Sequence, residues 1–365
     1  MKTIKPILFC GTLVALASAA PAQFTPGDLV VLRVGDGSAA LNNAGTAIFL
    51  NQYTTSGGAA GSFAIPSTGA SALVNSGSAT SEGALNLSAD GRYLVLAGYN
   101  APAGTAGIAS TTSAAVPRAV GTVDASGNFV LAATTSSYFS ANNVRSGASD
   151  GAGNFWAAGA NSGVVYMGNN SAAAAVSTSP LTNLRVIQTI GNNLFYSSSS
   201  GSSRGIYEVA GNPTSGSATA VSLINAGSSA SPYDFAFNPA MTIAYVADSD
   251  AYTSSSGIGG IEKWEFNGSS WVFDYSLSWA TNGTVGLAVD FSAANPVIYA
   301  TTANGVNLFK VTDTGASATG TWLASAPANT AFRGLDWAPV PEPATVVLTG
   351  LGLTALLGFR RLNRS

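Results

Sequence analysis

Two short apolar runs face each other across a polar turn in Tyr233-Asp-Phe-Ala-Phe-Asn-Pro-Ala-Met-Thr-Ile-Ala-Tyr-Val-Ala247. The first run places its aromatic residues at every second position, the second is a short continuous apolar run, and both are typical of β-strands. The Asn-Pro-Ala segment between them is typical of a turn. The stretch therefore predicts a β-hairpin. Four related stretches lie elsewhere in the chain, at residues 82–98, 144–158, 184–196 and 285–300.

Each of these hairpins is followed by a second one. Examples are residues 118–123 with 129–133, 205–209 with 221–224, 262–266 with 271–275, and 306–311 with 322–324. Four strands in a unit of about 40 to 60 residues are typical of a β-propeller blade. The sequence thus predicts an all-β chain folded as a β-propeller. A β-sandwich and a β-solenoid are the alternatives.

One unit is divided between the two ends of the domain. Residues 332–339 resemble a first strand, and residues 29–34, 47–53 and 71–75 resemble the three strands that should follow it. We expect the strand at 332–339 to pair with the amino-terminal strands and close the ring, because closure protects the sheet edges. This count gives six blades. It becomes seven if residues 118–134 form a truncated blade of their own.

The amino terminus has the features of a secretory signal. A basic segment at residues 1–5 precedes an apolar run, and Ala20-Pro-Ala22 before Gln23 is a small-residue cleavage site. Residues 1–22 therefore predict a signal peptide for the Sec translocon and signal peptidase. Cys10 is the only cysteine and lies inside this segment, so the mature chain has no thiol for a disulfide. Residues 23–339 form the predicted extracytoplasmic domain.

The carboxyl terminus has three parts in order. The triplet Pro341-Glu342-Pro343 comes first, then an apolar run at residues 344–359, then a basic tail at 360–365 that begins with Arg360 and Arg361. As a helix the run would span about 24 Å, somewhat short of a bilayer core of about 30 Å. Snorkelling arginines can extend it, and their charge favours a cytoplasmic carboxyl terminus.

This order of parts resembles the PEP-CTERM sorting signal of Gram-negative bacteria, over residues 340–365. The resemblance implies recognition by an exosortase and removal of the tail. It also implies transient anchoring in the inner membrane, followed by delivery to the cell surface or extracellular matrix, where an exopolysaccharide would be the associated partner. The alternative is an ordinary single-span membrane anchor.

The composition excludes several kinds of function. Outside the terminal segments the chain keeps 9 of its 14 basic and 16 of its 17 acidic residues, a net charge of −7, which disfavours nucleic-acid binding. The chain has no histidine, so the usual Ser-His-Asp and Cys-His catalytic arrangements and histidine-based metal sites are absent. We expect no cofactor. The one candidate metal is Ca²⁺ at Asp248 and Asp250, and the alternative there is a solvated acidic turn.

Large polar residues recur near the start of each predicted inner strand. They are Glu82, Arg145, Arg185, Tyr233 and Arg333, and only Val285 departs from the pattern. Inner strands surround the central channel of a propeller, so we expect these side chains to meet at its mouth. There they could bind an anionic ligand such as an acidic sugar. The alternative is a plug in which the arginines form ion pairs with Glu82 and Asp336.

The leading functional hypothesis is a non-enzymatic binding or structural propeller, exported through Sec and sorted through its tail to the cell surface or matrix. The alternative is an enzyme that acts on a carbohydrate or a lactone with a pair of carboxylates at the channel mouth. No particular pair of carboxylates is brought together by the sequence alone.

Overall fold

The computed structural model describes residues 23–341, except 169–172, 178, 179, 181, 256, 278, 280 and 281. The predicted signal peptide and the sorting segment from Glu342 onward, with Pro343, Arg360 and Arg361, lie outside the described residues. Within the described part, no helix is both long and apolar enough to cross a membrane.

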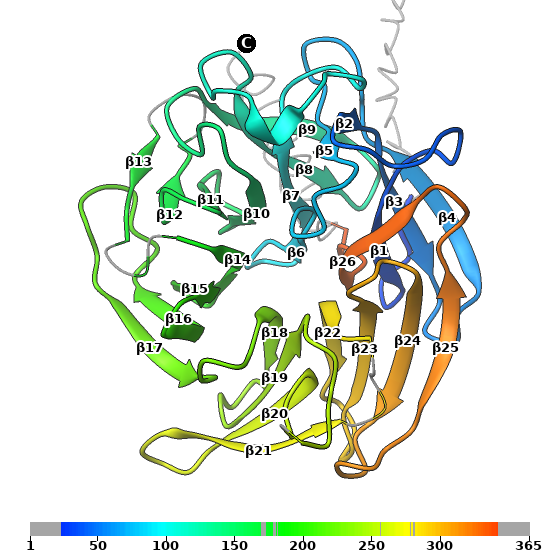
Figure 1. Ribbon diagram of the computed structural model, residues 1–365, viewed down its shortest axis with the longest axis vertical. Coiled ribbons are helices and arrows are strands. Elements are labelled where there is room, and N and C mark those ends of the chain that lie inside the picture. Colours follow the sequence, from blue (N-terminus) through cyan, green and yellow to red (C-terminus); the bar gives the residue numbers. More distant parts are fainter. Residues whose placement is uncertain are drawn as a thin grey trace, which may run out of the picture.

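The described residues form six four-stranded antiparallel sheets arranged around one centre (Figure 1). We number five of them as blades 1 to 5 in chain order. From inner to outer strand they are β6–β9 (Leu85–Leu87, Tyr93–Tyr99, Arg118–Asp124, Phe129–Thr135), β10–β13 (Val144–Ser149, Phe155–Gly159, Val164–Tyr166, Ala174–Ala175), β14–β17 (Leu184–Ile190, Asn193–Ser200, Ser203–Ala210, Ala220–Asn225), β18–β21 (Pro232–Phe237, Ile243–Asp248, Gly260–Phe266, Trp271–Leu277) and β22–β25 (Thr284–Asp290, Val297–Thr302, Asn307–Thr312, Gly320–Ser325).

The sixth sheet, the split blade, joins the two ends of the domain. Its inner strand is β26 (Ala331–Trp337), followed outward by β1 (Leu29–Val34), β3 (Ile48–Tyr53) and β4 (Ala59–Ala64). β26 and β1 pair antiparallel, with Leu29 opposite Trp337 and Val34 opposite Ala331. The predicted ring closure is therefore confirmed. The count is six blades, because β8 and β9 are the outer strands of blade 1 and not a blade of their own.

The prediction that residues 71–75 form the outer strand of the split blade is wrong. That strand is β4, whose Ala, Gly and Ser residues are almost all exposed and carry no apolar pattern. Ala72, Leu73 and Val74 are fully buried for another reason: they lie in a connecting segment packed against blade 1, where Val74 bridges Tyr99. Apolar runs this short do not distinguish a strand from other buried chain.

The core lies between neighbouring blades. Apolar side chains of blade 4 and blade 5 form one cluster, which includes Tyr245, Ile261, Leu287 and Phe309. Equivalent clusters fill the other gaps between blades. Large rings suit these wedge-shaped gaps because they bury much area with few rotatable bonds. The short 3₁₀ helix η1 (Ile108–Ser110) and the small sheet of β2 (Gly45–Thr46) with β5 (Asn75–Ser76) lie outside the blades.

The six inner strands run parallel to one another and are linked around the ring. Hydrogen bonds join Gly334 to Gly83, Leu87 to Asp336, Ala84 to Arg145, Ile187 to Ser146, Gln188 to Asp234 and Leu287 to Asp234. Between blade 5 and the split blade, the Thr301 hydroxyl of β23 donates a hydrogen bond to the Arg333 carbonyl. We call the side on which the inner strands begin the mouth face. The side on which they end, and from which the described chain leaves at Pro341, is the tail face.

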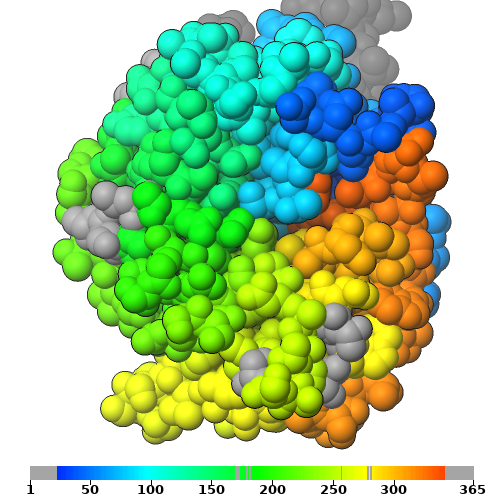
Figure 2. Space-filling model, viewed as in Figure 1, coloured from blue at the N-terminus to red at the C-terminus, as the bar shows by residue number. Residues whose placement is uncertain are grey.

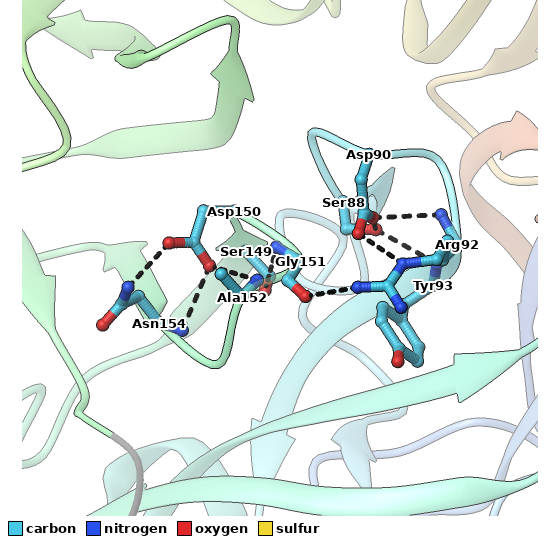
Figure 3. A network of polar contacts seen from close by, with 9 residues as sticks. All are labelled: Ser88, Asp90, Arg92, Tyr93, Ser149, Asp150, Gly151, Ala152 and Asn154. Carbon is cyan, nitrogen blue, oxygen red and sulfur yellow. Dashed lines mark hydrogen bonds and ion pairs between the residues drawn. The ribbon is translucent and has the colours of Figure 1, made fainter. Parts of the chain in front are cut away.

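On the tail face, the hairpin turns of blades 1 and 2 interlock (Figure 3). The Arg92 guanidinium lies 2.5 Å from the Asp90 carboxylate and donates to the Gly151 carbonyl at 2.8 Å. Asp150 accepts from the backbone N–H groups of Ala152 and Asn154, which fixes its own turn. Val340 also donates to the Gly91 carbonyl, so the end of the described chain is held against blade 1.

Candidate functional site

A small pocket lies at the centre of the mouth face. It is lined by Glu82, Arg185, Tyr233, Val285 and Arg333, together with Thr80, Ser81, Ala84, Val186 and Gly334. Its free volume is about 10 Å³, which is room for about one water molecule. In the space-filling view of Figure 2, atoms of opposite blades meet at the centre of the ring. The inner-strand pattern in the sequence thus brings four of its five polar residues to one pocket, and Val285 lines it as well.

Arg185 and Tyr233 form the best-defined contact of the pocket. Arg185 Nη1 donates to the Tyr233 hydroxyl at 2.7 Å, and the guanidinium carbon lies 4.6 Å from the centroid of the Tyr233 ring. Burial lowers the pKa of Arg185. The ring face and the hydroxyl hold the cation in place but offer it no opposite charge.

Arg333 and Arg145 complete the cationic group. Arg333 is almost fully buried and donates from Nη2 to the Gly77 carbonyl at 3.2 Å. Arg145 lies beside the pocket rather than in its wall, and its Nη1 donates to Asn183 and to the Leu184 carbonyl. Burial, with the neighbouring Arg185 charge, lowers the pKa of Arg145 to about 10, so it stays charged at neutral pH.

Glu82 is buried and its two carboxylate oxygens are already occupied. One accepts from the Tyr99 hydroxyl at 2.5 Å and from Asn143 at 2.6 Å, and the other accepts from the Ser76 backbone N–H at 2.7 Å. Burial raises the pKa of Glu82. By accepting three hydrogen bonds, this carboxyl group links Tyr99, Asn143 and the Ser76 backbone beside the mouth.

The predicted ion-paired plug is not formed. Among the described residues, neither Glu82 nor Asp336 lies within ion-pair distance of Arg145, Arg185 or Arg333. With the described residues, each of the three arginines forms hydrogen bonds through one of its three guanidinium nitrogens. The Nε atom of each is buried and has no partner in the described residues. Buried donors without partners are costly unless a ligand or water satisfies them.

Further down the channel, Asp234 and Asp336 are satisfied by the protein. Asp234 accepts from Gln188 and from the backbone N–H groups of Phe235 and Leu287. Asp336 accepts from the backbone N–H groups of Leu87 and Trp337. Burial raises the pKa of both carboxyl groups, to about 7 for Asp336. They link inner strands and do not line the mouth pocket.

The candidate Ca²⁺ residues do not share a free site. Asp248 is fully buried, and its oxygens accept from the backbone N–H groups of Ser231 and Asp250. Its carboxylate neighbour is Glu262, whose pKa is raised by burial and by the Asp248 charge. The Asp250 side chain is exposed. No group of three or more potential metal-ligating side chains occurs in the part of the chain that the structure describes. Calcium binding stays a prediction.

The sequence did not reveal the residues that support the mouth from outside the inner strands. Tyr99 and Asn143 hold Glu82, and the loop residues Thr80 and Ser81 cover the pocket. Arg118 is also fully buried, with its guanidinium 4.9 Å from the Tyr99 ring. These side chains sit at strand ends and in loops, and no repeat position marks them.

No protein-family model and no curated protein matches the chain. Solved structures match in part. A protein of Bacteroides uniformis, provisionally assigned as a 6-phosphogluconolactonase, is 14% identical over 82% of this chain and 83% of its own, with a TM-score of 0.46. A protein of Bacteroides fragilis with the same provisional assignment is 12% identical over 82% of each chain, with a TM-score of 0.46.

The periplasmic gluconolactonase of Pseudomonas aeruginosa is 12% identical over 82% of this chain and 83% of its own, with a TM-score of 0.45. At such low identity and TM-score, these similarities carry no argument about the activity of the present chain. The six-bladed propeller is established by its own sheet topology.

Proposed function

We propose that the chain is an exported binding protein whose mouth pocket takes an anionic group, such as a carboxylate of an acidic polysaccharide. One observation carries the proposal: Arg185 and Arg333 line the pocket, Arg145 lies beside it, and the buried Nε–H of each has no acceptor among the described residues. A planar guanidinium matches a carboxylate with two parallel hydrogen bonds, which makes arginine well suited to this ligand.

The small volume of the pocket limits what can enter it. Room for about one water molecule admits one oxygen atom of a ligand, such as one oxygen of a carboxylate, and not a whole sugar ring. A polysaccharide would therefore present a carboxylate to the mouth while its rings remain outside. The pocket wall contains one carboxylate, Glu82, and both of its oxygens are engaged. The alternative, an enzyme that uses two carboxylates at the mouth, would need a second carboxylate in this wall, and the described lining has none.

Delivery through a PEP-CTERM tail remains part of this proposal. The ring closes at Trp337, and the described chain leaves the tail face at Pro341, opposite the arginines. An exosortase-type enzyme could remove the following segment without breaking a blade. Deletion of residues 340–365 should abolish delivery to the cell surface or matrix, measured by fractionation. Unchanged delivery would contradict this part of the proposal.

The binding proposal is tested by titrating the full chain with an oligogalacturonate and with the same oligomer after its carboxylates are reduced to alcohols. We expect the acidic form to bind more tightly than the reduced form, and only the binding of the acidic form to fall, by about tenfold or more, in Arg185→Gln. Arg92→Gln, on the tail face, is the control and should bind like the parent. Equal binding of both oligomers, or of neither, would overturn the proposal.

A further inference from the structure

A second cavity opens on the tail face, away from the arginines. It lies where the split blade, blade 4 and blade 5 meet, and its volume is about 600 Å³. Its walls include Thr55 from the β3–β4 turn, Asp290, Phe291 and Ser292 from the β22–β23 turn, and Trp337 from the end of β26. Binding sites for small molecules commonly have volumes of about 300 to 1,000 Å³. We call this cavity the Trp337 groove.

Two aromatic rings of the groove, Trp337 and Phe291, are each packed against a tyrosine ring of the protein. The partly exposed Trp337 ring packs edge-on against Tyr299, with ring centroids 5.5 Å apart. Phe291 packs on Tyr245 with centroids 5.9 Å apart. Rings that are already immobilised lose little conformational entropy when a ligand stacks on them. Among the described residues, the indole N–H of Trp337 has no acceptor, whereas that of Trp156 donates to the Pro213 carbonyl.

The polar side of the groove carries a fixed negative charge. The Asp290 carboxylate accepts from the Ser292 backbone N–H at 2.8 Å. Hydrogen bonds from the Ser292 hydroxyl and backbone lower the pKa of Asp290, so the group is ionised at neutral pH. A carboxylate repels an anionic ligand but accepts hydrogen bonds from hydroxyl groups.

We propose that the Trp337 groove binds an uncharged glycan chain. One sugar ring would stack on Trp337, and the hydroxyls of that sugar would form hydrogen bonds with Asp290 and Ser292. Such a chain offers an apolar C–H face to an aromatic ring and hydroxyl donors to a carboxylate. It also offers oxygen acceptors for the free indole N–H. The ligand preference is therefore opposite to that of the mouth pocket, and this inference does not depend on the function proposed there.

The test uses the full chain and linear neutral hexasaccharides of glucose, mannose, galactose and xylose, followed by tryptophan fluorescence and calorimetry. We expect at least one to bind. Trp337→Ala should weaken that binding about tenfold, since a ring contact of this kind is worth about one factor of ten. Trp322→Ala is the matched control, because Trp322 is 51% exposed on the outer strand β25.

A second variant protects the test against misfolding of Trp337→Ala. Asp290→Asn changes an exposed turn and should weaken binding about threefold, as expected for one impaired hydrogen bond. Arg185→Gln should leave neutral-glycan binding unchanged. The inference is overturned if none of the four hexasaccharides binds, or if Trp322→Ala weakens binding as much as Trp337→Ala. If Trp337→Ala weakened the binding of an acidic hexasaccharide and left that of the neutral ones unchanged, the inference would also be overturned.

Discussion

The central channel holds ionisable side chains at its mouth and further down, and their hydrogen-bond partners differ. Towards the tail face, Asp234 and Asp336 accept hydrogen bonds from neighbouring inner strands. At the mouth, the buried Nε–H groups of Arg145, Arg185 and Arg333 have no partner among the described residues. Since an unsatisfied buried donor is costly, this difference underlies our proposal that the arginines bind a ligand, whereas the carboxyl groups link the inner strands of the ring.

The largest effect on stability is expected at Asp234. Asp234→Ala removes the acceptor for Gln188 and for two backbone N–H groups, and should lower the free energy of unfolding by about 3 kcal/mol in urea denaturation. Asp274→Ala is the control. Asp274 is partly exposed on the outer strand β21 and pairs with Lys263, so its loss should cost less than about 1 kcal/mol. If both variants lost the same free energy of unfolding, Asp234 would have no special structural role in the ring.

The interlocked turns of the tail face give a smaller effect. A methyl group on Gly151 would lie 2.1 Å from an Asp90 carboxylate oxygen, whereas one on Gly153 meets nothing within 4 Å. Both glycines have positive φ, so both substitutions carry backbone strain. Gly151→Ala should therefore lower the thermal unfolding free energy by about 1 to 2 kcal/mol more than Gly153→Ala. Identical melting temperatures would show that the contact between blades 1 and 2 contributes nothing.

A pH-dependent effect is expected from Asp336. Its folded-state pKa of about 7 lies above the ordinary value of 3.8. Between these values the folded chain holds a proton that the unfolded chain has released, so the free energy of unfolding falls as the pH rises from about 4 to 7. Asp336→Asn should remove about 3 kcal/mol of that fall. Urea unfolding at pH 4.5 and pH 7.5 measures it, and an unchanged difference in the variant would contradict the prediction.

The smallest effect on stability is expected at the mouth. Arg185→Gln removes a charge that has no ion-pair partner among the described residues, and should change the free energy of unfolding by less than about 1 kcal/mol. Its effect should appear in anion binding instead. A loss of stability as large as that of Asp234→Ala, in the same urea assay, would mean that the mouth and the deeper part of the channel do not differ in role.

The blades could be predicted because each hairpin carries its own pattern. In residues 233–247, strand alternation and turn residues lie next to each other in the sequence, and the structure has β18 and β19 there. β4 was missed because its exposed small residues have no such pattern. The positions of Arg185 and Arg333 followed from the repeat, since equivalent residues of neighbouring inner strands reach one pocket, whereas Arg145 lies beside it.

The hydrogen-bond partners of the buried carboxyl groups could not be predicted from the sequence. Glu82 is held by Tyr99 and Asn143, which lie 17 and 61 residues away in the sequence. Asp248 is a close neighbour of Glu262 across two strands, and not of the Asp250 side chain as the short spacing suggested. The Trp337 groove is formed by turns of three blades. Such contacts depend on how the loops fold over the ring. The repeat pattern of the sequence does not contain the conformations of these loops, so the contacts could not be predicted from it.

The most direct measurement of the central claim is nitrogen NMR of the arginine Nε–H groups, with and without an oligogalacturonate. We predict that the signals of Arg145, Arg185 and Arg333 shift on binding, because their unpaired donors gain acceptors, while that of Arg92 on the tail face does not. Unshifted signals for all three mouth arginines at saturating ligand, or an equal shift of Arg92, would contradict the claim that the mouth is an anion site.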